Sequence, residues 1–344
     1  MRTGWIVAAC GGLLAAGGWR LAADGPPLPA RSAGDAGRPA GGVQSSAALR
    51  SLEGVWSFST LTPLERPAEF AGKALVSDAE AAAWVRQNLA RNNRDRRDGG
   101  ADVDVGRAVN DYWFERGTEL AVRDGQRMTS LIVDPPDGRL PALTAEARAR
   151  LAARAADNRE HPADGPENRS LQERCLSFNA GPPMLPGPYN NYVQILLFPG
   201  YAVIVTEMIH DARVVPLEGR VPGQYRGRVP GPEGTRPPLR RWLGEPRGHW
   251  DGATLVVDST NFTANTNLRG ADEQLRLTER FTPVDHTTLF YEFTVDDPTA
   301  FARPWTAALP MTRTADRLFE YACHEGNYAL MDILRGARYQ EKPQ

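Results

Sequence analysis

The chain has 344 residues, of which 41% are hydrophobic and 24% are charged. This composition is typical of folded globular proteins, and it excludes disordered chains, coiled coils and polytopic membrane proteins. Lys and Arg number 40 against 42 Asp and Glu, a net charge of -2, so the chain lacks the overall positive charge of a nucleic-acid-binding protein and no nucleic-acid partner is predicted. The 33 Gly and 28 Pro residues predict many turns, which favours a β-rich fold.

The first 48 residues have the composition of a leader followed by a tether. Arg2 and an apolar, small-residue run over residues 4–19 predict a signal peptide over residues 1–23. A lipoprotein anchored through Cys10 is the alternative. Residues 24–48 are rich in Gly, Pro and Ala and predict a disordered tether. We therefore expect a periplasmic or secreted protein without a membrane span in the mature chain.

Removal of the leader leaves two cysteines, Cys175 and Cys323. In an oxidising compartment they predict one disulfide, which would restrict the unfolded chain by about 4–5 kcal/mol in the loop-entropy model. Two buried free thiols are the alternative. Neither cysteine has a second cysteine at metal-ligand spacing, so no metal site is predicted.

Two segments have clear helical patterns. The first begins at the capping box of Ser77 and Glu80, which precedes an apolar stripe of Ala81, Val85 and Leu89. The second begins at Thr144 and ends around residue 158. Both helices are expected at the periphery of the domain.

Short strands and turns account for most of the remaining chain. Residues 192–198 and 201–207 predict a hairpin whose strands are buried on both faces. The dipeptide Asp251-Gly252 predicts a type I′ turn between two strands. A third hairpin joins residues 274–281 to 288–295. Further strands are expected over 131–133 and 318–323. The prediction is a mainly β fold, an antiparallel barrel or sandwich with two peripheral helices, in a single domain over residues 49–340.

The tripeptide Gly54-Val55-Trp56 resembles the opening strand of lipocalin-like, or calycin, barrels. The resemblance covers about ten residues. It implies a barrel with an interior that can hold a ligand.

Two glutamates are the leading candidates for acid–base chemistry. Period-two alternation places Glu279 on the inward face of its strand, where it must pair with an arginine or line a polar cavity. Glu207 closes a strand and is followed by His210, Asp211 and Arg213. A bend is required for Glu207 and His210 to share a pocket. A rim of solvated charge is the alternative at this strand end.

Other polar residues gather at predicted strand ends, where binding sites are common. His249 precedes the Asp-Gly turn, and Asp258 and Asn261 follow the next strand. His324 and Asn327 follow Cys323. A disulfide would bring these residues close to three further candidate ligand-binding residues: Tyr189, Asn190 and Asn191. A structural hydrogen bond is the alternative role for each histidine.

Several catalytic signatures are absent from the sequence: the nucleophile elbow, the phosphate-binding loop, the dinucleotide fingerprint and the zinc-protease motif. Their absence disfavours hydride transfer, nucleotide hydrolysis and serine-type acyl transfer. No cofactor is predicted.

Five motifs taken together resemble an uncharacterised family of exported soil-bacterial proteins, and the similarity runs from about Leu52 to Arg338. The motifs start at Glu173 (ERCL), Pro188 (PYNN), Thr206 (TEMIHDAR), Gly248 (GHWDG with TLVVD) and Tyr321 (YACHEGNY). The resemblance implies export and one extended domain, and it assigns no residue a catalytic role.

The first functional hypothesis is an enzyme, a hydrolase or lyase acting on a small polar molecule or a saccharide. Glu207 and Glu279 would be the acid and base, with Arg213 as a clamp for a substrate carboxylate. His210, His249 and His324 would transfer protons. A lipocalin-like carrier of a small apolar ligand and a structural envelope protein are the alternatives, and the sequence does not decide whether the protein is an enzyme.

Overall fold

The computed structural model describes residues 51–107, 109–179, 181–217, 239–264, 266 and 268–341, all of which belong to one compact unit over residues 42–344. The predicted signal peptide, the tether, Cys10 and the first two residues of the predicted domain lie outside the described residues.

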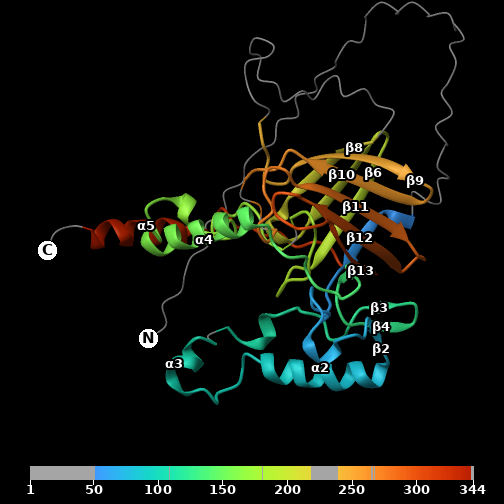
Figure 1. Cartoon of the computed structure of the whole chain (residues 1–344), viewed down its shortest axis with the longest axis horizontal. Coiled ribbons are helices and arrows are strands. Elements are labelled where there is room, and N and C mark those ends of the chain that lie inside the picture. The colour runs from blue at the N-terminus through green and yellow to red at the C-terminus, as the bar shows by residue number, and fades with distance from the viewer. Residues whose placement is uncertain are drawn as a thin grey trace, which may run out of the picture. The chain divides into compact units, whose positions relative to one another are not determined.

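One large antiparallel sheet dominates the described part of the chain (Figure 1). Its strands follow the order β8-β7-β6-β1-β13-β12-β11-β10-β9, and β5 pairs with β13. The mainly β, antiparallel prediction is therefore confirmed. The strands are β1 Gly54–Ser57, β5 Ile132–Asp134, β6 Tyr192–Phe198, β7 Tyr201–Thr206, β8 Ala212–Pro216, β9 Glu245–Asp251, β10 Thr254–Thr260, β11 Arg276–Pro283, β12 Thr288–Asp296 and β13 Trp305–Thr314.

The sheet curls until its two edges approach each other, but among the described residues no strand ladder closes it into a barrel. The edges, β8 and β9, are linked by one parallel bridge between Leu217 and Gly248. A Cβ atom on Gly248 would lie 2.7 Å from Leu217 and 2.8 Å from Val215. Glycine is therefore required where the two edge strands meet.

The strands alternate between buried and more exposed side chains, so each has one face in the core. In β7, Ala202, Ile204 and Thr206 are buried, whereas Tyr201 and Val203 are partly exposed. The expectation that this hairpin is buried on both faces is wrong, because only the inward face of the curled sheet is covered. Alternation in β11 holds as predicted and places Glu279 inward.

Aromatic rings fill the inside of the curled sheet. Phe281, Tyr291, Phe293 and Trp305 form a continuous series, with successive ring centroids 5.0, 5.6 and 5.7 Å apart. Trp56 of β1 is also fully buried, and its indole N–H donates to the carbonyl of Leu52 at 3.0 Å. The predicted opening strand thus anchors the chain to a densely packed core.

Both predicted helices are present. The helix α2, Asp78–Asn92, begins at Ser77 with the complete capping box, and α4, Ala145–Glu160, begins at Thr144. The small sheet β2-β4-β3 pairs Leu75–Val76, Gln126–Met128 and Val122–Arg123. The α2 residue Trp84 packs with Val76 and Phe70 in a second, smaller core.

Two predictions about local structure are wrong, and one strand was not predicted. Residues 318–323 form turns and coil, and no strand in the described part of the chain pairs with them. The strand β13 was not predicted, since Pro310 disfavours a central strand. Pro310 is tolerated because it lies between the β13 residues paired with β5 and those paired with β1. The turn after Asp251 has a positive φ only at Gly252 (59°), which fits type II′ rather than type I′.

Two further helices were also not predicted. They are α3, Gly100–Val105, and α5, Tyr328–Gln340. The helix α5 contains Gly336 and begins without a capping box, so its sequence signal is weak.

Candidate functional site

The five residues predicted to be catalytic lie in three separate places. Glu279 is inside the curled sheet, and His249 is at the outer face of β9. Glu207, His210 and His324 lie where β7 ends and the C-terminal segment passes, a region that we call the rim. The structure therefore does not bring Glu207, Glu279 and His249 into one pocket.

Inside the sheet, Glu279 is held by a bidentate ion pair. Arg213 donates to its two carboxylate oxygens at 2.5 and 2.9 Å. The Tyr291 hydroxyl donates to Glu279 Oε1 at 2.7 Å and accepts from the backbone N–H of Met184 at 3.1 Å. Burial and the charge of Glu279 raise the pKa of Tyr291 well above its usual value, so the hydroxyl stays a donor.

This network supplies the arginine partner expected for a buried Glu279. It also changes the interpretation of Arg213, because both terminal nitrogens of the guanidinium are bonded to Glu279 and the residue is 5% exposed. Arg213 was predicted to clamp a substrate carboxylate next to Glu207. Its place in the structure is instead across the core, linking β8 to β11.

On the outer face, His249 Nδ1 lies 3.7 Å from Asp258 Oδ2. Asp258 also accepts a hydrogen bond from Thr278 at 2.7 Å. Asn261 adopts a positive φ of 60° and donates to the carbonyl of Leu239, which gives it a role in shaping the loop. A hollow of about 420 Å³ lies here, lined by Asp258, Ser259, Thr260, Arg276, Leu277, Thr278, Thr294, Asp296 and Pro304.

At the rim, the chain bends sharply directly after β7. Such a bend was expected if Glu207 and His210 were to lie at the same place. Ile209 and His210 have positive φ angles of 64° and 57°. This conformation is unfavourable for a β-branched residue such as Ile209. The bend buries Glu207 to 3% exposure. Its carboxylate accepts from the Asn190 side chain at 2.6 Å and from the backbone N–H of Phe319 at 3.1 Å.

A second glutamate, Glu115, was not among the predicted site residues and lies at the rim next to Glu207. The Tyr192 hydroxyl donates to Glu115 Oε1. Partial burial raises the pKa of Glu115; the hydrogen bond from Tyr192 opposes the increase, and the charges of Glu207 and Asp316 add to it. Burial is the largest cause of the raised pKa of Tyr192, and the hydrogen bond to Glu115 raises this pKa further. The rim thus holds a protonatable carboxyl next to a buried carboxylate.

Nothing in the local sequence marks Glu115, which lies in an irregular segment between Phe114 and Arg116. The backbone places it: its N–H donates to the carbonyl of Pro188, and its carbonyl accepts from the Asn191 side chain. Asn191 is fully buried. Asn191, predicted to bind substrate, therefore positions the segment of Glu115 instead.

The remaining rim residues come from the C-terminal segment and the β7–β8 loop. Burial raises the pKa of Asp211, and the nearby side chains of His324 and His210 oppose this effect. Burial also raises the pKa of Tyr321, with the adjacent Tyr189 adding to it. Tyr189 therefore lies against the C-terminal segment, and Asn190 shares Glu207 with Phe319 of that segment.

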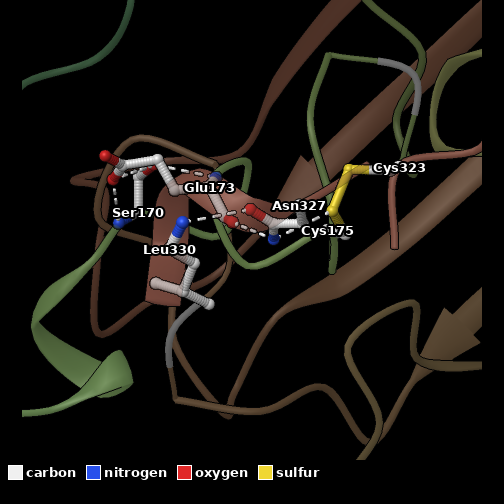
Figure 2. Close-up of a disulfide and its surroundings, with 6 residues drawn as sticks. All are labelled: Ser170, Glu173, Cys175, Cys323, Asn327 and Leu330. Carbon is white, nitrogen blue, oxygen red and sulfur yellow. Dashed lines mark hydrogen bonds between the residues drawn. A yellow bond between two sulfur atoms is a disulfide. The ribbon is translucent and has the colours of Figure 1, made fainter. Parts of the chain in front are cut away.

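The sulfur atoms of Cys175 and Cys323 are 1.99 Å apart, at disulfide distance (Figure 2). Asn327, predicted to bind substrate, lies next to the two cysteines, and both ends of its side-chain amide are hydrogen-bonded. Its Nδ2 donates to the carbonyl of Glu173 at 2.7 Å, and its Oδ1 accepts from the backbone N–H of Leu330 at 3.3 Å. It is the N-cap of α5. A hollow of about 590 Å³ lies beside the disulfide, lined by Gln172, Glu173, Cys175, Glu320, Tyr321, Ala322, Cys323, Gly326 and Asn327.

Across the residues that the structure describes, no group of three or more His, Cys, Asp or Glu side chains could hold a metal ion. Within the same residues, no helix is both long and apolar enough to cross a membrane. Comparison with known proteins finds no matching family model, curated protein or solved structure.

Proposed function

We propose that this protein is an exported enzyme, a hydrolase or a lyase, that acts on a small polar molecule or a saccharide at the rim. The observation that carries the proposal is the pair of glutamates. Glu115 has a raised pKa, and Glu207 is buried close to it with neutral hydrogen-bond donors. Neighbouring carboxyl groups in different environments are the usual arrangement for acid–base chemistry near neutral pH.

The proposed roles follow from exposure and contacts. Glu115 is partly exposed and keeps its proton to a higher pH than an ordinary glutamate, so it is the general acid. Glu207 orients Asn190 and sets the charge that Glu115 experiences. His210 and His324, near Asp211, would accept a proton from water or from the substrate. Export fits a cysteine pair at disulfide distance.

The carrier alternative requires an apolar cavity inside the sheet. The inner-face rings of Phe281, Tyr291, Phe293 and Trp305 pack against one another instead, which weighs against a carried ligand. A structural envelope protein is the remaining alternative, and it predicts no turnover of any substrate.

The test is a turnover screen with the purified mature chain against neutral, acidic and amino-sugar oligosaccharides and their nitrophenyl glycosides, read by mass spectrometry. Glu115→Gln should lower turnover at least about 100-fold, the usual contribution of a general acid. Glu119→Gln is the matched control, because Glu119 lies on the same segment but pairs with Arg127 on the surface. Equal activity of Glu115→Gln and wild type would refute the role of Glu115, and no turnover across the panel would favour the envelope alternative.

A further inference from the structure

The C-terminal segment between β13 and α5 crosses the rim without belonging to any strand or regular helix. We call residues 315–327 the strap. Its contacts with the body include three groups along its length. The backbone N–H of Phe319 donates to Glu207, Tyr321 lies against Tyr189, and Asn327 at its end donates to the carbonyl of Glu173. The disulfide from Cys323 to Cys175 is its covalent anchor.

The disulfide is reachable from outside. Both cysteines line the hollow of about 590 Å³, so a small thiol or an extended peptide can approach the sulfur atoms. The two sulfurs are not equivalent. Cys175 is 3% exposed, whereas Cys323 is partly exposed. An incoming thiolate therefore reaches Cys323 more readily.

The surroundings of Cys175 suit a leaving thiolate. The side-chain amide of Asn327 donates to Cys175 Sγ at 3.4 Å, and the backbone of Glu173 holds the same amide in place (Figure 2). Asn327 is also the N-cap of the 13-residue helix α5, whose N-terminal end favours negative charge. A thiolate on Cys175 would thus form next to a hydrogen-bond donor and the positive end of a helix dipole.

We propose that the Cys175–Cys323 disulfide is a redox modification site for a dithiol reductant, which attacks Cys323, expels Cys175 and thereby releases the strap from Glu207. In the first step a bond forms between the reductant sulfur and Cys323 Sγ, the bond between the two cysteines breaks, and its electron pair stays on Cys175. The second thiol of the reductant then attacks the mixed disulfide and frees Cys323. Two electrons and two protons pass from the dithiol to the cysteines, and the reductant becomes a disulfide.

This inference goes beyond the proposed function and does not depend on it, because the contact between Phe319 and Glu207 exists whatever the rim does. Opening the disulfide removes the covalent anchor of the strap and leaves weaker contacts to hold it. The hydrogen bond from Phe319 to Glu207 then becomes transient, and Glu207 becomes accessible to solvent.

The first experiment traps the attack with glutathione, a monothiol, on the oxidised full chain, with simultaneous alkylation of the freed thiol by iodoacetamide. Peptide mapping should find glutathione on Cys323 and the alkyl group on Cys175 in at least tenfold excess over the reverse pattern. An equal mixture, or glutathione mainly on Cys175, would overturn the proposed direction of attack.

The second experiment tests the leaving-group role with Asn327→Asp and Asn327→Ser. Both replacements keep an oxygen that can cap α5 at Leu330, but neither keeps the amide donor to Cys175. Both should form the adduct at least threefold more slowly than wild type, whereas Asn88→Asp on α2 should not change the rate. Rates equal to wild type in both variants would show that the amide does not assist the step.

The third experiment follows amide hydrogen exchange after reduction with dithiothreitol. The exchange rate at Phe319 should rise at least tenfold, while Val257 of β10 stays protected as an internal control for the intact sheet. Unchanged protection at Phe319 in reduced protein would overturn the release of the strap.

Discussion

Two buried glutamates in this protein have opposite surroundings. Glu279 in the core is neutralised by Arg213 and bonded by Tyr291. Glu207 at the rim accepts from two neutral N–H donors and lies near the carboxyl group of Glu115, whose pKa the charge of Asp316 also raises. The comparison teaches that burial alone does not mark a reactive carboxylate: what distinguishes the rim is negative charge without a described cationic partner on Glu207.

The backbone separates the two regions in the same way. The residues of the core network extend from regular strands, β8, β11 and β12. Glu207 instead precedes two residues with positive φ, Ile209 and His210. Backbone strain concentrates at functional sites because the surrounding structure must hold groups where chemistry needs them. Four predictions test whether the core is structural and the rim is reactive.

The largest effect is expected from breaking the core pair. Arg213→Met leaves the Glu279 carboxylate buried without a cation, which should lower the free energy of unfolding by about 3–5 kcal/mol. Urea denaturation measures this loss. The double replacement of Arg213 by Met and Glu279 by Leu should recover most of it, because neither charge remains buried. A double variant as unstable as the single one would show that the pair itself supplies the stability.

Glutamine replacements compare the two glutamates directly. Glu279→Gln leaves Arg213 without its charged partner and should cost about 3 kcal/mol. Glu207→Gln loses one of its two hydrogen bonds from neutral donors, which should lower the free energy of unfolding by about 1 kcal/mol. The replacement also removes a charge that repels Glu115. Denaturation of both variants at pH 7 measures the difference. Equal losses would mean that the two sites are energetically alike, contrary to the comparison.

The raised pKa of Glu115 predicts a pH dependence of stability. Above its ordinary value of 4.5 the folded protein still holds this proton while the unfolded chain has released it. Stability from this group is therefore complete below pH 4.5 and is lost as pH rises through the raised pKa. Glu115→Gln should match wild type at pH 4 and gain on it at pH 7 in thermal unfolding. A gain that is the same at both pH values would indicate an uncharged cause.

The smallest effect is expected at the strained bend. His210 is exposed and holds a positive φ, which glycine adopts freely. His210→Gly should raise the free energy of unfolding by about 0.5 kcal/mol. Relief of backbone strain stabilises the folded state, and the greater conformational freedom of glycine in the unfolded chain offsets part of this gain. His249→Gly is the contrasting variant, because His249 lies in a strand, and it should destabilise. A loss of stability at both positions would argue that the bend stores no strain.

Local patterns predicted much of the fold. The capping box at Ser77, the alternation around Glu279 and the strand at Trp56 all depend on neighbours within a few residues, and all are present. The strand β13 and the helix α5 were missed because their signals are weak, a Pro310 inside the strand and a Gly336 inside the helix. The segment 318–323 has a strand-like pattern but pairs with none of the strands that the structure describes.

The candidate site was less predictable. Glu207 and its bend could be inferred from the dense ionisable cluster around it. Glu115 could not be inferred, because it lies in an irregular segment and its contact with Tyr192 joins residues 77 positions apart in the sequence. Arg213 was predicted to lie beside Glu207 because the two are close in the sequence. The alternation of side chains along β8 instead points Arg213 into the core, toward Glu279.

The sequence by itself determined the antiparallel β class, the two capped helices and the inward direction of Glu279, because each follows from propensity and periodicity over a short span. The tertiary structure decided which charges meet. Arg213 reaches Glu279 across the curled sheet, Glu115 reaches Glu207 through the Pro188 segment, and Phe319 reaches Glu207 through the strap. These contacts depend on how segments that are far apart in the sequence pack against one another, and no local sequence pattern encodes that packing.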